Sequence, residues 1–294
     1  MTTASVVIRT YNESRYLGQL LASIRNQVFP CGSVEIVLVD SGSTDDTVAI
    51  GQAFDVRLVR IAQADFTFGR SLNVGCEAAS GDLLVFISGH CIPVGVDWLQ
   101  NLVRPILAAQ AVYSYGKQVG NEDSYFSERQ LFRKYFPDHS MVPQTGFFAN
   151  NANSALLAST WRELRFDEQL TGLEDMDLAK KISGRQLGIA YCADAPVYHL
   201  HDESWGKIRL RYEREAIALQ RIMPEVQLSF GDFLRYFTSA CLLDFGAALQ
   251  ERKLHRVAGE IVMFRLMQFW GAYRGNHVHR VISRDMKNRY FYPR

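Results

Sequence analysis

The stretch Ile36–Thr47 reads IVLVDSGSTDDT, and its two halves differ in chemistry. The four apolar residues at its start are typical of a buried strand. Asp40 ends this strand, a turn of small residues follows at 41–43, and the acidic pair Asp45 and Asp46 is typical of a first helical turn. A buried strand that ends in a carboxylate and leads directly into a helix predicts one unit of a parallel α/β sheet.

The same unit recurs through the first hundred residues. Further strand-like stretches lie at 5–9, 56–61 and 82–88, and stretches with helical spacing lie between and after them at 16–27, 44–53, 69–79 and 96–110. This alternation predicts an α/β fold with a parallel, doubly wound sheet and right-handed crossovers. Ligands bind such sheets outside the carboxyl ends of the strands, so the site is expected in the loops 10–13, 40–43, 62–68 and 88–91.

The rest of the chain does not continue this alternation of strands and helices. Residues 112–167 are irregular and rich in aromatic residues, a later strand is expected at 188–197, and helices are expected at 207–223, 233–249 and 257–270. We therefore expect a domain at 1–204, with one half at about 1–110 and another at about 111–204. A helical region is expected at 205–294.

Composition excludes several classes of protein. Hydrophobic residues make up 48% and charged residues 21% of the chain, which is ordinary for a globular protein. A net charge of +1 argues against a nucleic acid partner. Five widely spaced cysteines without a CxxC pair argue for a reducing compartment, hence a cytoplasmic protein. Neither a signal peptide nor an uninterrupted apolar span is expected.

Two polar loops point to a nucleotide site. One contains Thr10, Asn12 and Glu13, and the other contains Asp40 and Ser41. Either loop alone is explained by ordinary helix capping, but together, after adjacent strands, they favour a bound nucleotide.

The motifs TYNE at 10–13, VDSGSTDDT at 39–47 and FGRSLNVG at 68–75 together resemble the opening of family 2 glycosyltransferases. The resemblance covers roughly residues 5–202 and implies the GT-A fold, with a donor half at about 1–110 and an acceptor half at about 111–204. It also implies transfer of a sugar from a nucleotide-sugar donor, with a UDP-sugar favoured, to an acceptor hydroxyl. By this resemblance the donor-binding residues are Thr10, Asn12, Glu13, Asp40, Ser41, Arg70, Asn73, Ser88 and Gly89.

The chain departs from the family at the metal-binding DXD motif, where it reads Ser88-Gly89-His90. Carboxylates there normally hold a divalent ion that neutralises the departing diphosphate. His90 can serve as a ligand instead, with His199 and His201 from the later strand, for Mn²⁺ more readily than for Mg²⁺. Alternatively the metal is lost and Arg70 stabilises the phosphate, or the donor is a CMP-activated sugar acid that needs no metal. A catalytically inactive scaffold is the remaining alternative.

A fourth motif, LEDMDL at 173–178, resembles the acidic motif beside the acceptor site. An inverting displacement needs a carboxylate within reach of the attacking hydroxyl, and the resemblance gives that role to Asp175. Glu174 and Asp177 would then be supporting charges, and Asn151 would contact the acceptor sugar. The alternative is that all three acids only complement the helix dipole.

Together these patterns predict an inverting glycosyltransferase in surface polysaccharide or glycolipid synthesis, with a glycan or lipid-linked glycan as acceptor. The amphipathic C-terminal helices and a tail at 274–294 with six basic residues and one acidic residue suit the surface of an anionic membrane. A dimer interface or homo-oligomer explains the same helices equally well, so both alternatives stay open.

Overall fold

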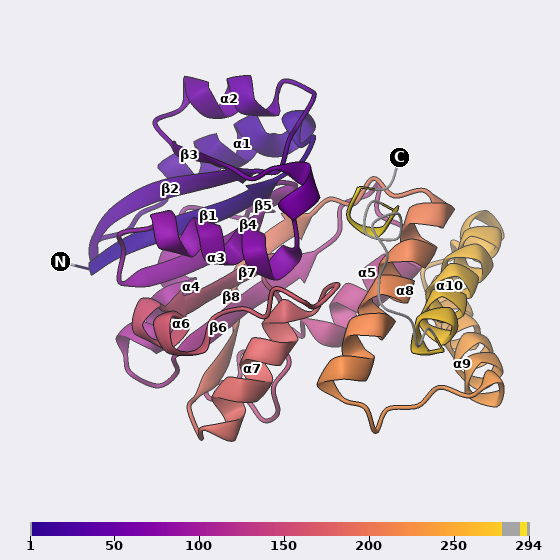
Figure 1. Cartoon of the computed structure of the whole chain (residues 1–294). Helices are drawn as coiled ribbons and strands as arrows, with labels where there is room; N and C mark the ends of the chain where they lie inside the picture. The colour runs from indigo at the N-terminus through magenta and orange to yellow at the C-terminus, as the bar shows by residue number, and fades with distance from the viewer. Residues whose placement is uncertain (1, 278–288, 293–294) are drawn as a thin grey trace. The chain divides into compact units, whose positions relative to one another are not determined.

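The computed structural model describes residues 2–277 and 289–292, so most of the basic tail lies outside the described residues. The chain divides into two compact units (Figure 1). The first comprises residues 1–121, 135–169 and 174–200, and the second comprises 122–134, 170–173 and 201–294. Most of the second unit is the chain from His201 onward, and two short segments from the middle of the chain belong to it as well.

The first unit is built on one mixed sheet. Its strands are β1 (Thr2–Thr10), β2 (Gly32–Asp40), β3 (Arg57–Arg60), β4 (Leu83–Ser88), β5 (Cys91–Pro93), β6 (Tyr113–Val119), β7 (Asn153–Leu157) and β8 (Ile189–His199). They are arranged in the order β3-β2-β1-β4-β7-β6-β8-β5. The α/β class is confirmed, and the four strands expected from the repeated unit are β1 to β4, all of them parallel.

Side chains alternate between the two faces of this sheet, and each face carries its own helices. On one face, Val6, Ile8 and Leu38 pack against Leu17, Leu20 and Leu21 of α1 (Ser14–Arg25) and against α4 (Trp98–Leu107). On the other face, α3 (Phe68–Ala78) approaches closely because Gly75 has no side chain. A Cβ there would lie 2.4 Å from Val7 Cγ1 and 2.9 Å from Val39 Cγ2.

The half of the sheet formed by β5 to β8 is not purely parallel, unlike the sheet that the sequence predicts. β7 is antiparallel to both β4 and β6, and the short β5 is antiparallel to β8. β6 and β7 lie in the region whose sequence is irregular, where polar residues interrupt the apolar alternation that marks strands. The remaining elements of this unit are α2 (Thr47–Ala53), η1 (Gln63–Asp65), α6 (Ala158–Leu164) and α7 (Glu174–Gly184).

The second unit is helical. It consists of most of α5 (Phe126–Tyr135) together with α8 (Trp205–Ile222), α9 (Phe230–Gln250) and α10 (Leu254–Asn276), as expected for the C-terminal region. Phe126, Cys241 and Ile261 pack together at its centre. A buried ion pair joins α9 to α10: the Nε and Nη2 atoms of Arg265 donate to the two carboxylate oxygens of Asp244 at 2.7 and 2.8 Å. Among the described helices, none has the length and apolarity needed to cross a bilayer.

All five cysteines are free thiols. Four are buried, and burial raises the pKa of Cys76, Cys91, Cys192 and Cys241, which keeps them as unreactive thiols. Cys31, in the turn before β2, is exposed.

Candidate active site

The loops after β1 and β2 are locked to each other at the carboxyl edge of the sheet. The Asn12 side-chain oxygen accepts from the backbone N–H of Thr44 at 2.8 Å, and the Ser43 hydroxyl accepts from the Asn12 N–H at 2.9 Å. Asn12 adopts a φ of 57°, a left-handed conformation that asparagine tolerates better than most residues. The two loops expected to bind the nucleotide therefore form one braced surface.

Asp40 and its neighbours shape this surface from inside. The Asp40 carboxylate accepts from the backbone N–H groups of Gly42 and Ser43, each at 3.1 Å, and so fixes the turn. The Ser41 hydroxyl donates to the carbonyl of Thr10, whose own hydroxyl donates to Val39. The structure thus brings these predicted donor residues together, and their contact with a nucleoside stays a prediction.

Asn73 and Arg70, on α3, are engaged with the segment around residues 161–168. The Asn73 amide donates to the Phe166 carbonyl and to Glu168, both at 2.9 Å. Its oxygen accepts from Trp161 Nε1 at 3.0 Å and from the Phe166 N–H at 3.1 Å. All four hydrogen-bonding positions of this buried amide are used within the protein. Arg70 forms an exposed ion pair with Glu168 at 3.3 Å, so it is the more accessible of the two to a donor phosphate.

The Ser88-Gly89-His90 turn follows β4 directly and lies against the loop after β1. A Cβ at Gly89 would lie 2.8 Å from Cγ of Glu13, so a side chain at this position would displace Glu13. The Glu13 carboxylate is 2.8 Å from Nδ1 of His90. The Glu13 carboxylate therefore orients the imidazole of His90.

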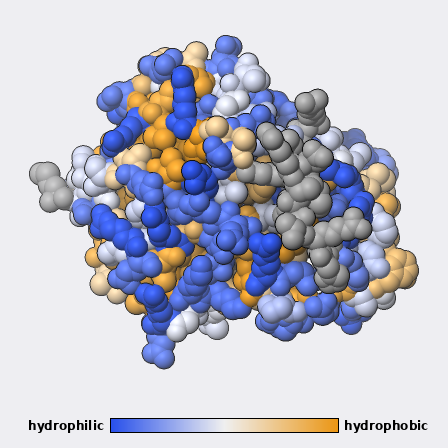
Figure 2. Space-filling view, in the orientation of Figure 1, coloured by the Kyte–Doolittle hydropathy of each residue, from blue (hydrophilic) through white to orange (hydrophobic). Residues whose placement is uncertain are grey.

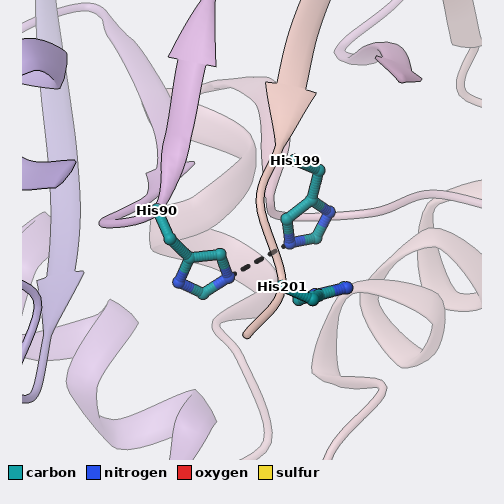
Figure 3. Close-up of side chains that lie close together, drawn as sticks. All are labelled: His90, His199 and His201. Carbon is teal, nitrogen blue, oxygen red and sulfur yellow. Dashed lines mark hydrogen bonds between the residues drawn. The ribbon is translucent and has the colours of Figure 1, made fainter. Parts of the chain in front are cut away.

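His90 and His199 lie side by side, as Figure 3 shows. Their rings are stacked with centroids 5.1 Å apart, and their two Nε2 atoms are 3.2 Å apart. His199 ends β8, and β8 pairs with β5, so the sheet register itself sets this juxtaposition by pairing Cys91 with His199.

The hydrogen bonds on the far side of each ring determine what the facing atoms offer. His90 Nδ1 meets the Glu13 carboxylate, and His199 Nδ1 meets the side-chain oxygen of Gln118 at 2.7 Å. Both partners are acceptors, so both Nδ1 atoms carry a proton and both Nε2 atoms of the neutral rings present lone pairs to each other. Two lone pairs at this distance repel unless a proton or a cation lies between them.

A first-row divalent ion fits this arrangement. Imidazole nitrogens bind such ions at about 2.0–2.1 Å, which places two ligand atoms of one ion roughly 3.0–3.5 Å apart. The separation of 3.2 Å between the two Nε2 atoms agrees with this spacing. Nitrogen ligands favour Mn²⁺, Fe²⁺ or Zn²⁺ over Mg²⁺. His90 and His199 are therefore candidate metal ligands.

His201, the third predicted ligand, is the first residue of the second unit. Its Nδ1 lies 2.7 Å from the Glu128 carboxylate, which also accepts from Arg211 at 3.2 Å. Burial opposes the charge on Glu128, but His201 and Arg211 outweigh it and lower the pKa of this carboxyl. His201 thus has the carboxylate partner typical of a metal-binding histidine, and its role as a ligand stays a prediction.

Asp175 lies in the first turn of α7 and is almost fully buried, with 9% of its surface exposed. Its two oxygens accept from the backbone N–H groups of Asn151 at 2.9 Å and Met176 at 2.8 Å. Burial and the adjacent Glu174 carboxylate raise the pKa of Asp175 to about 7, against these hydrogen bonds and Arg9, which lower it. A carboxylate with this pKa is suited to accept a proton near neutral pH.

The neighbouring acids have partners of their own. Glu174 is buried and forms an ion pair with Arg9 at 3.1 Å, while the Arg9 guanidinium lies over the ring of Phe68. Asp177 pairs with Lys181, one turn further along α7, at 2.6 Å. Glu174 therefore acts electrostatically on Asp175, whereas Asp177 stabilises the helix.

Gln118, which the sequence did not single out, and the Asn150–Asn151 loop connect the histidines to Asp175. Gln118 of β6 accepts from His199 and donates to the Asn150 side chain at 3.0 Å. The next residue, Asn151, supplies the N–H that holds Asp175, and its side-chain oxygen accepts from Tyr113 at 2.7 Å. The Ser88 N–H donates to Ala152 of the same loop at 3.3 Å.

The Asn150–Asn151 loop therefore lies between the two groups of candidate residues. Gln118 and Tyr113 are buried side chains with polar groups in a strand. In the sequence, such a polar or aromatic residue inside a strand is the feature that points to this connection.

Comparisons with known proteins identify the family of this chain. Residues 5–162 match the model of the family described as Glycosyl transferase family 2. The O-antigen chain rhamnosyltransferase RfbN of Salmonella typhimurium is 25% identical over 245 residues, which cover 77% of this chain and 75% of the relative.

Two solved structures share the fold. A mannosyltransferase from Pyrobaculum calidifontis, in complex with GDP-Man and Mn²⁺, has a TM-score of 0.66 at 16% identity and covers 94% of this chain and 88% of its own. Glucosyl-3-phosphoglycerate synthase from Mycobacterium tuberculosis, with Mn²⁺, UDP and its product, has a TM-score of 0.58 at 24% identity, covering 75% and 80%. With its family match over more than half its length, this chain belongs to glycosyltransferase family 2 and is a glycosyltransferase with the GT-A fold.

Proposed function

We propose that this glycosyltransferase moves a sugar from a nucleoside diphosphate sugar to a hydroxyl of a glycan or lipid-linked glycan, with inversion at the anomeric carbon. The observation that carries the proposal is the continuous arrangement of the braced β1 and β2 loops, the His90–His199 pair and Asp175 along one edge of the sheet. The relative named as an O-antigen chain rhamnosyltransferase supports a role in polysaccharide synthesis.

In the proposed reaction Asp175 accepts the proton of the acceptor hydroxyl while that oxygen attacks the anomeric carbon. Its carboxylate is held by two backbone N–H groups, so it keeps one orientation through the displacement. Asn151 fixes this geometry through its backbone, and its side chain is tied in turn to Tyr113 and Ser154. The bond from the sugar to the diphosphate breaks on the opposite side, and the nucleoside diphosphate leaves.

The leaving diphosphate needs positive charge. His90 and His199 would hold a divalent ion, which supplies this charge when bound. Glu13 and Gln118 keep both imidazoles in the tautomer that binds a cation. Arg70 supplies a further cation on the donor side of the sheet. We favour a UDP-sugar as donor. The M. tuberculosis structure contains UDP and Mn²⁺, which supports it, whereas the P. calidifontis structure contains GDP-Man and Mn²⁺.

Calorimetric titration with UDP, GDP, dTDP and CMP, each with Mn²⁺ and again with EDTA, tests the proposal. We expect one nucleoside diphosphate to bind with Mn²⁺ and to lose most of its affinity with EDTA, and His90→Ala to reproduce that loss. The exposed His255→Ala is the matched control.

Preference for CMP, or binding unaffected by EDTA, would instead support the metal-independent transferase. It would also mean that a shared proton joins His90 and His199. Binding of none of the four would favour an inactive scaffold.

A further inference from the structure

Helix α9 carries large apolar side chains on the side that faces away from the core of its unit. Leu242, Leu243 and Leu249 are exposed to 69%, 75% and 61%. Phe233, Cys241, Asp244 and Ala248 mark the buried side of the helix. An α-helix turns by about 100° per residue, so Leu242 and Leu249 lie above one another on the helix surface and Leu243 lies beside them. These three leucines are about opposite the buried residues. Hydrophobic residues are visible at the surface over α9 and α10 in Figure 2.

Helix α10 extends this apolar surface. A short turn at 251–253 joins the two helices as an antiparallel hairpin, and Tyr236 stacks on Phe269 with centroids 6.2 Å apart. Moving seven residues along each antiparallel helix from that pair brings Leu243 opposite Val262. Val262 and Met263 are also exposed. We call this surface the outer ridge; it consists of Tyr236, Leu242, Leu243, Leu249, Val262 and Met263.

Basic residues lie at the end of the hairpin beside the outer ridge. Arg252 and Arg256 are exposed, and neither forms an ion pair with any residue in the described ranges. Glu251, the acid next to Arg252 in sequence, is occupied by Arg133 at 2.9 Å and by Lys253 at 3.0 Å. The tip of the hairpin therefore presents unbalanced positive charge.

We propose that the outer ridge and the basic tip bind the surface of an anionic lipid bilayer, with the hairpin lying along the interface. Apolar side chains then enter the boundary between headgroups and acyl chains while Arg252 and Arg256 meet anionic headgroups. The same hairpin of a second copy fits these charges less well. Asp244 is buried against Arg265 and Glu260 accepts from the backbone of Phe126, so these acids do not complement the arginines.

Other aromatic and basic residues of the helical unit do not belong to this surface. Phe264 is fully buried, and Trp270 packs against Phe233 inside the helical unit. Arg209 and Arg211 of α8 form ion pairs within the unit with Glu213 and Glu128. This binding is separate from the proposed transfer reaction, so either can fail alone.

Flotation of the whole chain with lipid vesicles tests the proposal. Vesicles of phosphatidylcholine alone are compared with vesicles that contain phosphatidylcholine and phosphatidylglycerol in equal amounts. Both are tested at 0.1 M and 0.5 M salt. We expect binding to the anionic vesicles only. It should weaken at least about tenfold in Leu242→Asn/Leu243→Asn and also in Arg252→Gln/Arg256→Gln. The Leu107→Asn/Leu187→Asn pair, two exposed leucines of the first unit, is the matched control and should bind normally.

Three results would overturn the proposal. These are equal binding to neutral and anionic vesicles, no binding to either, and unchanged binding in the variants of the ridge and tip. A dimer detected by light scattering that Leu242→Asn/Leu243→Asn dissociates, without vesicle binding, would assign the surface to a second copy. Nucleotide binding measured on the same variants should be unchanged, which separates this surface from the donor site.

Discussion

The raised pKa of Asp175 predicts how the rate of transfer depends on pH. With a pKa of about 7, roughly one in eleven molecules has the carboxylate ionised at pH 6 and about ten in eleven at pH 8. The base must be ionised to accept a proton, so the rate should rise about tenfold from pH 6 to pH 8. Continuous measurement of nucleoside diphosphate release at saturating donor gives this profile.

Two substitutions separate catalysis from structure. Asp175→Asn should lower kcat by about 10²- to 10⁴-fold and leave donor affinity unchanged, because the proton acceptor is lost and the nucleotide loops are untouched. Glu174→Gln removes a negative charge that raises the pKa of Asp175, so its profile should shift to lower pH. Asp177→Asn, on the same helical turn, is the matched control.

A flat profile between pH 5.5 and 8.5, or turnover preserved in Asp175→Asn, would refute the assignment of the base. A shift of the Glu174→Gln profile to higher pH would refute the electrostatic reasoning while leaving the base in place.

Three further substitutions test other parts of the structure. Glu13→Gln should weaken Mn²⁺ binding by about 10- to 100-fold in calorimetry, since the carboxylate that orients His90 becomes a neutral amide; unchanged affinity would exclude a metal at His90. Asp244→Asn leaves Arg265 buried without a counter-charge and should lower the free energy of unfolding by about 3–5 kcal/mol in denaturant melts. Asn73→Ala leaves several buried groups without a hydrogen-bond partner and should lower the free energy of unfolding by about 3 kcal/mol or more in the same melts. An unchanged stability would mean that the α3 contacts are dispensable.

The parallel half of the fold follows from local sequence, because β1, β2 and β4 each contain a run of buried apolar residues. Asp40 is predictable for the same reason, since it ends such a run. β6 and β7 are not predictable in this way. Gln118 and Asn153 are polar groups satisfied by partners distant in sequence, which local periodicity does not report.

The candidate site shows the same division. Motif resemblance identifies His90 and Asp175 as residues to examine, but the pairing of His90 with His199 depends on the register of β5 and β8. The link through Gln118 and Asn150 joins three segments more than thirty residues apart. The motif identifies Asn73 as a site residue, but only the structure shows its hydrogen bonds. Its four partner atoms lie some ninety residues further along the chain.

Cys31 is suited to site-specific chemical labelling of this enzyme. It is the only exposed thiol of the five, and burial keeps the other four protonated and inaccessible. It precedes the first residue of β2, whereas Asp40 ends that strand nine residues later, about 30 Å away at 3.3 Å per residue. A maleimide fluorophore or a surface tether should therefore attach at one defined position, at the end of the sheet opposite the nucleotide loops, and leave sugar transfer intact for single-molecule observation.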